Sequence, residues 1–164
     1  MTKNFPSDWS CELPDCLKVE RRGAIAILTL NRPEKRNALS DELVLALTAA
    51  FSNVPEGVQA IVLNGAGDHF SGGLDLNELK ESNIVESFET SKIGQHLNNT
   101  VQYCKVPVVS VLHGAVVGGG LELALACRYR VALDDSSTRL GLPEVLLGLH
   151  PGFGGTVRSI ERIG

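Results

Sequence analysis

The sequence predicts an α/β fold in which helices cover the faces of a largely parallel sheet. Three times along its 164 residues, an apolar and β-branched run leads into a loop rich in glycine or proline and then into a segment whose apolar residues recur at helical spacing. This order favours parallel strands joined by helices. Ligands of such sheets bind beyond the carboxyl ends of the strands, so we expect a functional site in the loops that follow the strands.

Composition and charge narrow the function classes. Apolar residues make up 43% of the chain and charged residues 21%, as in globular proteins. The net charge of −4 argues against a nucleic-acid-binding protein, which would be basic. No apolar run approaches the ~20 residues of a membrane span, and the first residues lack the apolar core of a signal peptide, so the cytoplasm or an organelle matrix is the expected location. The four cysteines and four histidines lack metal-ligand spacing, which predicts reduced thiols and no metal.

The first strand is expected at residues 24–30 (AIAILTL), after a lead-in of residues 1–17. We expect one core domain over residues 18–164. The first strand ends in a loop of residues 31–39 (NRPEKRNAL), where Pro33 cannot donate to a neighbouring strand. This loop also carries adjacent positive charges.

Ser40 is a suitable N-cap for the first helix, because its side chain can accept a hydrogen bond from a free backbone N–H. One apolar stripe follows at helical spacing, formed by Leu43, Leu47, Ala50, Phe51 and Val54. A second strand is expected at residues 60–63 (AIVL). It runs into a glycine-rich loop of residues 64–76 (NGAGDHFSGGLDL), where Asp75 can begin a short helix.

A long helix is predicted over residues 86–103. Its expected buried side consists of Phe88, Ile93, Leu97, Val101 and Tyr103. A third strand at residues 106–112 (VPVVSVL) leads through a run of glycines into a helix over residues 121–127 (LELALAC).

The last part of the chain is richer in turns. A fourth strand is expected at residues 129–133 (YRVAL). Residues 134–158 are dominated by turns and hold a short apolar segment at residues 145–149. Residues 156–163 resemble the first turns of a further helix.

Residues 113–122 (HGAVVGGGLE) form the most informative stretch. A strand, a glycine turn and a helix start in that order direct free backbone N–H groups toward negative charge. Gly118, Gly119 and Gly120 have no Cβ, so a ligand can approach the backbone closely. Glu122 falls in the first helical turn. The stretch is interpreted either as an anion or oxyanion site with a carboxylate beside it, or as a tight turn with a solvated acid.

A second glycine loop strengthens the oxyanion interpretation. One N–H donor can come from residues 72–74 and another from residues 118–120, and two donors on one oxygen make an oxyanion hole. Glu144 follows Pro143 among apolar neighbours, and with Glu122 it suits general acid–base chemistry beside an activated carbonyl. The alternative for Glu144 is a turn carboxylate that caps a short helix. A nucleotide site is disfavoured, because neither GxGxxG nor a P-loop is present.

Four blocks in this order resemble the enoyl-CoA hydratase/isomerase (crotonase) superfamily. They are LNRPEKRNALS (30–40), HFSGGLDL (69–76), HGAVVGGGLELALAC (113–127) and LGLPEVLLGLHPGFGGT (140–156). The last block most resembles the hydratase part of bifunctional fatty-acid oxidation enzymes. The resemblance implies a spiral of ββα units, assembled as trimers or dimers of trimers. It also implies that the family's C-terminal helical part is missing after Gly164.

The same resemblance assigns roles to individual residues. It implies that the N–H groups of Leu74 and Gly119 are the oxyanion donors and that Glu122 and Glu144 are the catalytic carboxylates. Leu74 replaces the alanine common in the family, a change that a backbone donor tolerates. The implied CoA and acyl contacts are Lys35, Arg36, Ala38, Gly72, Asp75, Leu76, Gly118, Pro143 and Leu147.

The implied activity is hydration of the 2,3-double bond of an acyl-CoA thioester. No metal or redox cofactor is expected, because CoA is part of the substrate. Isomerases of the family usually work with the second glutamate alone, so Glu122 favours a hydratase. The alternatives are an enoyl-CoA isomerase, another reaction through a thioester enolate, or a non-catalytic acyl-CoA-binding or oligomerisation fragment. A complete protein is expected to form a homotrimer or hexamer.

Overall fold

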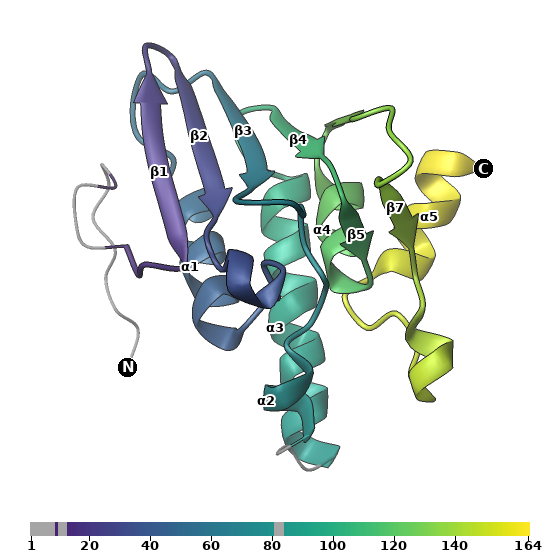
Figure 1. Ribbon diagram of the computed structural model, residues 1–164. Helices are drawn as coiled ribbons and strands as arrows, with labels where there is room; N and C mark the ends of the chain where they lie inside the picture. Colours follow the sequence, from purple (N-terminus) through teal and green to yellow (C-terminus); the bar gives the residue numbers. More distant parts are fainter. Residues whose placement is uncertain (1–8, 10–12, 81–83) are drawn as a thin grey trace.

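The computed structural model describes Trp9, residues 13–80 and residues 84–164 (Figure 1). Its main sheet consists of β1 (Leu17–Arg22), β2 (Ile25–Leu30), β3 (Ala60–Gly65), β4 (Val108–Leu112) and β6 (Tyr129–Ala132), in that spatial order. Strands β2, β3, β4 and β6 run parallel, and β1 pairs antiparallel with β2. The predicted α/β class with largely parallel pairing is confirmed.

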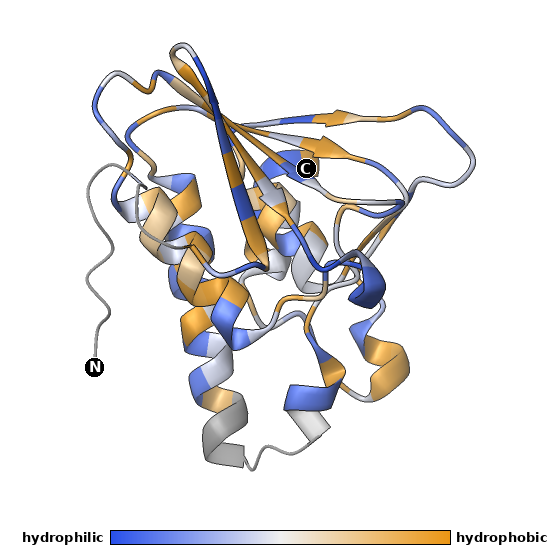
Figure 2. Cartoon of the chain, turned by 60° about the vertical axis from the view of Figure 1, so that its left-hand side comes forward, coloured by the Kyte–Doolittle hydropathy of each residue, from blue (hydrophilic) through white to orange (hydrophobic). Residues whose placement is uncertain are grey.

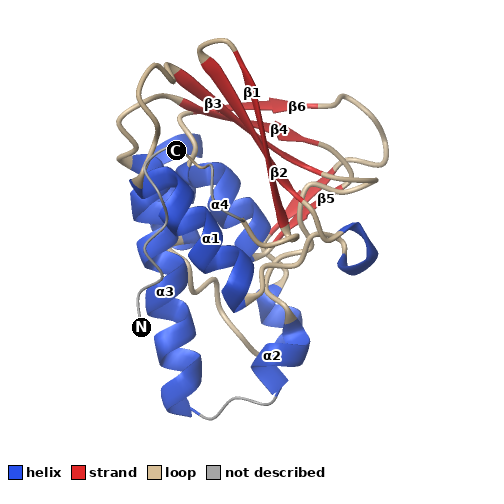
Figure 3. Cartoon of the chain, turned by 90° about the vertical axis from the view of Figure 1, so that its left-hand side faces the viewer, coloured by secondary structure: helices blue, strands red, loops and turns tan. Residues whose placement is uncertain are grey.

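Helices cover one face of this sheet (Figure 3). The α-helices are α1 (Asp41–Ser52), α2 (Leu76–Lys80), α3 (Ile84–Gln102), α4 (Gly119–Ala126) and α5 (Gly155–Ile163). Two short 3-10 helices, η1 (Pro33–Lys35) and η2 (Glu144–Leu147), lie in loops. Helix α3 packs between α1 and α4, and α4 also contacts α5.

The core lies between the sheet and the helix layer. Alternate residues of β2 and β3 are fully buried, including Leu28, Leu30 and Leu63, because successive side chains of a strand point to opposite faces. Leu47 of α1 and Leu97 of α3 meet them from the helical side and are also fully buried. Figure 2 shows this pattern as hydrophobic stripes on the strands and helices.

Helix α1 begins as its sequence predicts. The Ser40 side-chain oxygen accepts a hydrogen bond from the Leu43 N–H at 3.3 Å, and Asp41 and Glu42 occupy the first turn, where acidic side chains favour the helix dipole. The predicted N-cap is therefore confirmed.

Three strands were not predicted. Strand β1 is an edge strand with four of its six side chains exposed, so its sequence (LKVERR) carries little apolar signal. Strands β5 (Ala115–Val117) and β7 (Arg139–Gly141) have only three residues each, too few for an alternation pattern. They pair with each other in a separate two-stranded sheet.

Two predictions about helices need correction. Phe88 and Tyr103 are 60% and 79% exposed rather than buried, whereas Leu97 and Val101 are buried as expected. The N-terminal part of α3 extends beyond the neighbouring helices (Figure 3), and Tyr103 follows the last residue of the helix. Helix α4 begins at Gly119, two residues earlier than predicted.

None of the helices in the described ranges combines the length and hydropathy needed to cross a bilayer. The predicted lead-in, residues 1–17, falls largely outside the described residues. Within them, β1 already begins at Leu17, which is buried.

We expect the substitution Ser40→Ala to lower the free energy of unfolding by about 1 kcal/mol, because the Leu43 N–H would lose its partner at the start of α1. Urea denaturation followed by circular dichroism measures this loss. Ser52→Ala, at the exposed end of the same helix, is the matched control and should change little. Equal losses in both variants would contradict a capping role for Ser40.

Candidate active site

The short strand β5 brings three loops together. Along one edge, the Ser71 N–H donates to the Ala115 carbonyl and the Val117 N–H donates to the Ser71 carbonyl, both at 3.1 Å. Along the other edge, β5 pairs in parallel with β7 and places Val117 opposite Gly141. The Gly118 N–H extends this pairing to the Gly141 carbonyl at 3.0 Å. The loops that follow β3, β5 and β7 therefore meet at one place.

Two unpaired backbone donors lie at this meeting point. Gly73 adopts a φ of +88°, and a Cβ placed on it would lie 3.3 Å from the Gly119 nitrogen, so the two glycine loops touch. Gly119 is the first residue of α4, where the N–H groups lack helical partners. Within the described ranges, neither the Leu74 N–H nor the Gly119 N–H makes a hydrogen bond. This arrangement suits an oxygen that carries negative charge.

The loop of Leu74 is held by polar contacts that need no ligand. The Ser71 hydroxyl donates to the Asn37 carbonyl at 2.9 Å and accepts from the Gly73 N–H at 3.2 Å. Asn37, which is fully buried, in turn donates to two backbone carbonyls of the loop after β3. Gly120 of α4 packs directly against Ser71. The donor loop is thus preorganised.

Glu122 lies in the first turn of α4 and is 2% exposed. Its Oε1 accepts hydrogen bonds from the N–H groups of Phe153 at 2.8 Å and Gly155 at 2.7 Å. Burial raises the pKa of Glu122 above its ordinary value, and the charge of Glu144 adds to the rise. The two N–H groups and the charge of Arg158 oppose it without cancelling it. A carboxyl with a raised pKa can exchange a proton nearer to neutral pH.

Glu144 enters the same region from a different element. It is the first residue of η2, directly after Pro143, and its Oε2 is buried without a hydrogen-bond partner in the described part of the chain. Its Oε1 lies 3.2 Å from where a Cβ on Gly118 would stand, so a glycine leaves room for this carboxylate. The side chain is therefore inward-facing rather than a solvated turn acid.

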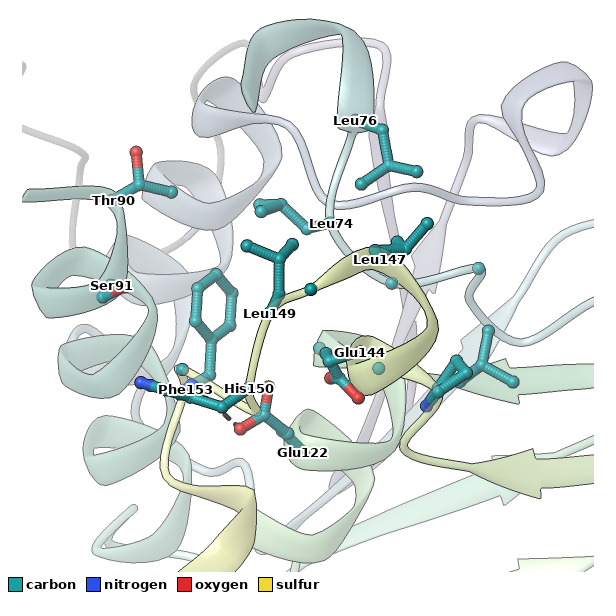
Figure 4. A pocket seen from close by; sticks show the side chains of 18 residues that line it. Leu74, Leu76, Thr90, Ser91, Glu122, Glu144, Leu147, Leu149, His150 and Phe153 are labelled. Atoms are coloured by element: carbon teal, nitrogen blue, oxygen red, sulfur yellow. Dashed lines mark hydrogen bonds between the residues drawn. The ribbon is translucent and has the colours of Figure 1, made fainter. Parts of the chain in front are cut away.

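Both carboxylates and both donors line one cavity of about 500 Å³ (Figure 4). The cavity is also lined by other predicted residues, namely Gly72, Leu76, Gly118, Pro143 and Leu147. The lining residues that sequence analysis missed include Thr90, Ser91, Leu149, His150 and Phe153. The apolar run before Leu149 is the signal that could have indicated part of this wall. Nothing in the sequence indicated that Thr90 and Ser91 of α3 would line a cavity.

Four predicted contact residues lie outside this cavity. Lys35 and Arg36 are exposed at η1, and Ala38 follows them. Asp75 is 6% exposed, and its Oδ2 accepts from Arg32 Nη2 at 2.9 Å. Burial by itself raises the pKa of Asp75, but the hydrogen bonds and charges around it, chiefly those of Arg32, bring that pKa below its ordinary value.

The ion pair joins two loops. Arg32 also donates to the Ala38 carbonyl at 2.7 Å, so one guanidinium ties the loop after β2 to the loop that carries Leu74. Roles for Lys35, Arg36 and Asp75 in binding CoA remain predictions.

No group of three or more His, Cys, Asp and Glu side chains in the described residues is arranged to hold a metal ion. Cys16, Cys104 and Cys127 are free thiols, and burial raises the pKa of Cys127 to about 12. Cys11 lies outside the described residues. The polar side chains that line the cavity are those of Thr90, Ser91, Glu122, Glu144 and His150.

Residues 20–164 match the family model described as enoyl-CoA hydratase/isomerase. The chain belongs to the enoyl-CoA hydratase/isomerase family. The resemblance carried by the four sequence blocks is thereby confirmed.

Individual relatives agree with this family. The short-chain enoyl-CoA hydratase of Clostridium acetobutylicum is 35% identical over 149 residues, covering 89% of this chain and 56% of the relative. The solved structure of a candidate enoyl-CoA hydratase from Rhodopseudomonas palustris is 44% identical, with a TM-score of 0.83 over 89% of this chain and 56% of that one. A further candidate hydratase, from Thermobifida fusca and in complex with acetoacetyl-CoA, is 25% identical, with a TM-score of 0.80 over 92% and 62%.

These matches confirm the predicted crotonase-like fold. They also establish that the chain spans only 56% of the curated relative. The matched residues, 20–164, include the loops of Leu74 and Gly119 and both glutamates.

We expect Asp75→Asn to lower the free energy of unfolding at pH 7 by about 1–3 kcal/mol. The acceptor of the buried hydrogen bond from the Arg32 guanidinium would change from a charged carboxylate to a neutral amide. A depressed carboxyl pKa stabilises the fold above the unfolded value, near pH 4, and this contribution is lost as the pH falls through the folded value. The difference between the variant and the original chain should therefore shrink on acidification. Asp134→Asn, at an exposed position, is the control.

We expect Gly120→Ala to lower the free energy of unfolding by about 1–3 kcal/mol through overpacking. Its Cβ would come within 2.7 Å of Ser71 Cβ and 2.8 Å of the Ser71 carbonyl oxygen, and neither atom can move without displacing the donor loop. Thermal or urea unfolding measures the effect. Gly141→Ala, whose Cβ would meet nothing within 4 Å, should be nearly neutral. A neutral Gly120→Ala would show that this contact is not tight in solution.

Proposed function

We propose that this chain carries the catalytic core of an enoyl-CoA hydratase, which adds water across the 2,3-double bond of an acyl-CoA thioester. The observation that supports this most directly is that one cavity is lined by two carboxylates and by two backbone N–H donors that have no partner among the described residues. The C. acetobutylicum relative, named a short-chain enoyl-CoA hydratase, and the T. fusca structure, which holds acetoacetyl-CoA, support an acyl-CoA substrate.

The thioester carbonyl oxygen would accept from the N–H groups of Leu74 and Gly119. When water adds at C3, negative charge develops on this oxygen as an enolate, and donors already in position stabilise that charge more than the ground state. Loss of one such donor typically costs ~10²–10³ in rate. The N-terminus of α4 adds the favourable end of a helix dipole at the same atom.

Glu122 and Glu144 would hold and activate the water. One carboxylate takes a proton from the water as its oxygen bonds to C3, and a carboxyl group of the same pair delivers a proton to C2 when the enolate collapses, so that the pair ends with the protons it began with. Glu122 uses Oε1 for the two N–H groups of its own chain, so its Oε2 is the atom that faces this task. The raised pKa of Glu122 moves its proton exchange toward neutral pH. Two carboxylates in one cavity, Glu122 and Glu144, support hydration over isomerisation.

We assign the CoA part of the substrate to the loops after β2 and β3. Lys35 and Arg36 supply exposed positive charge for phosphates, and Ala38, Gly72 and Leu76 belong to the adjoining backbone. Asp75 acts by fixing the geometry of both loops through Arg32. Pro143 and Leu147 would line the acyl side. No metal or redox cofactor is needed for this chemistry.

We further propose that the complete protein works as a homotrimer or hexamer in the cytoplasm or an organelle matrix. Apolar side chains that face solvent on α5 support contacts with further protein, and these are Val157, Ile160 and Ile163, each at least 60% exposed. Light scattering on the purified protein tests the assembly.

The purified chain should hydrate crotonyl-CoA, measured as loss of absorbance of the conjugated thioester. Glu122→Gln and Glu144→Gln should each lower the rate by about 10²-fold or more, because an amide cannot exchange the proton. Glu56→Gln, on an exposed turn away from the cavity, is the matched control and should retain full activity.

The outcomes separate the remaining alternatives. Binding of CoA thioesters with no hydration, unaffected by either glutamate substitution, would identify an acyl-CoA-binding module instead. Conversion of a 3-enoyl to a 2-enoyl thioester that depends on Glu144 alone would identify an isomerase. Unchanged hydration in both glutamine variants would remove the roles assigned to these residues.

A further inference from the structure

Helix α5 buries an arginine that no carboxylate pairs within the described residues. Arg158 is 5% exposed, and its guanidinium donates only to neutral oxygens. These acceptors are Gln102 Oε1 at 2.8 Å, Asn99 Oδ1 at 2.7 Å, the Phe153 carbonyl at 3.1 Å and the Gly154 carbonyl at 3.5 Å. Burying a cation without a counter-ion is costly, so a compensating role is expected.

Two of these acceptors belong to the segment that holds Glu122. Residues 153–155 present the N–H groups of Phe153 and Gly155 to Glu122 Oε1. The Gly154 carbonyl and the Gly155 N–H form one peptide unit, and in a trans peptide these two groups point in opposite directions. Arg158 therefore donates to the carbonyl of the peptide between Gly154 and Gly155, and the N–H of the same peptide donates to the Glu122 carboxylate.

Helix α3 fixes the position of the guanidinium. Asn99 and Gln102 accept from it on successive turns, and Asn98 donates to the same Phe153 carbonyl at 3.0 Å. A planar guanidinium with several donors can hold all of these oxygens at once, which a single ammonium cannot. Gly154 also leaves room for it, because a Cβ there would collide with Arg158 Nη1.

We propose that Arg158 is a positioning residue for Glu122. Through residues 153–155 it directs two N–H groups at Oε1, which sets the orientation of the carboxylate and leaves Oε2 to handle the proton. The catalytic meaning of this role rests on the proposed hydratase function. The contacts that run from α3 through Arg158 to Glu122 do not depend on that function.

Nearby charges influence the pKa values of both Glu122 and Arg158. Those that act on Glu122 are the charges of Glu144 and Arg158. Those that act on Arg158 are the charges of Glu161, Glu122, Tyr103 and Arg162. Loss of Arg158 removes a nearby positive charge and loosens two N–H donors. Both changes raise the pKa of Glu122 further.

The first test uses Arg158→Met, Arg158→Lys and Arg162→Met, the last being an exposed arginine on the same helix. In crotonyl-CoA hydration we expect Arg158→Met to lower kcat by about 10-fold or more while KM changes by less than about 2-fold, because substrate contacts stay intact. The acidic limb of the kcat profile should move to higher pH. Arg158→Lys should keep the limb near its original pH with intermediate kcat, and Arg162→Met should match the original chain.

The second test does not need activity. With glutamate labelled by ¹³C at Cδ, NMR gives the titration of Glu122, whose signal is assigned by its absence in Glu122→Gln. We expect the pKa of Glu122 to rise by at least about 0.5 in Arg158→Met and to stay constant in Arg162→Met. A chain that lacks hydratase activity but shows this rise would refute the proposed function and leave the positioning role standing.

A folded Arg158→Met variant in which both the Glu122 titration and the Phe153 and Gly155 amide signals are unchanged would overturn the proposal. If Arg158→Met does not fold, Asn99→Ala and Gln102→Ala replace it, because each removes one acceptor of the guanidinium. They should move the Glu122 titration in the same direction by a smaller amount. No movement in either variant would overturn the proposal as well.

Discussion

The site depends on three residues of extended backbone, β5. Hydrogen bonds along one edge join it to Ser71, and pairing along the other edge joins it to β7. Because β5 runs directly into α4, it also sets where the N-terminus of that helix stands. Leu74, Gly119 and Glu144 come from loops far apart in the chain and meet only because both edges of β5 are occupied. Backbone hydrogen bonds do this work, so the side chains of β5 contribute little to the choice of chemistry.

In the hydration that we propose, the electrostatics of the cavity balance two opposing needs. A developing enolate needs hydrogen-bond donors, and water activation needs carboxylates close by, whose charges would repel the enolate. Backbone donors and a helix N-terminus stabilise the oxygen without adding a mobile cation. Glu122 is kept in a buried position by two N–H groups, which reduces the cost of its desolvation. Glycines at positions 73 and 118 let these groups come close enough for the balance to work.

Much of the fold and the residues at the centre of the candidate site could be predicted because their signals are local. Apolar periodicity identified the parallel strands and the main helices, and Ser40 marked the start of α1. The four glycine- and proline-containing blocks pointed to Leu74, Gly119, Glu122 and Glu144. Strands β5 and β7 escaped detection because three residues cannot establish a period. The exposure of Phe88 could not be predicted either, because α3 extends beyond the helices that pack against it (Figure 3).

The sequence by itself determined the class of fold, the family and the residues able to do acid–base and oxyanion chemistry, since these follow from residue type and short spacing. Only the tertiary structure decided how they act together. It directs Glu122 toward the N–H groups of Phe153 and Gly155, and it pairs Asp75 with Arg32. It also buried Arg158 behind the segment that holds Glu122. Each of these contacts joins residues at least 30 positions apart or depends on one that does, and no local pattern encodes such a distance.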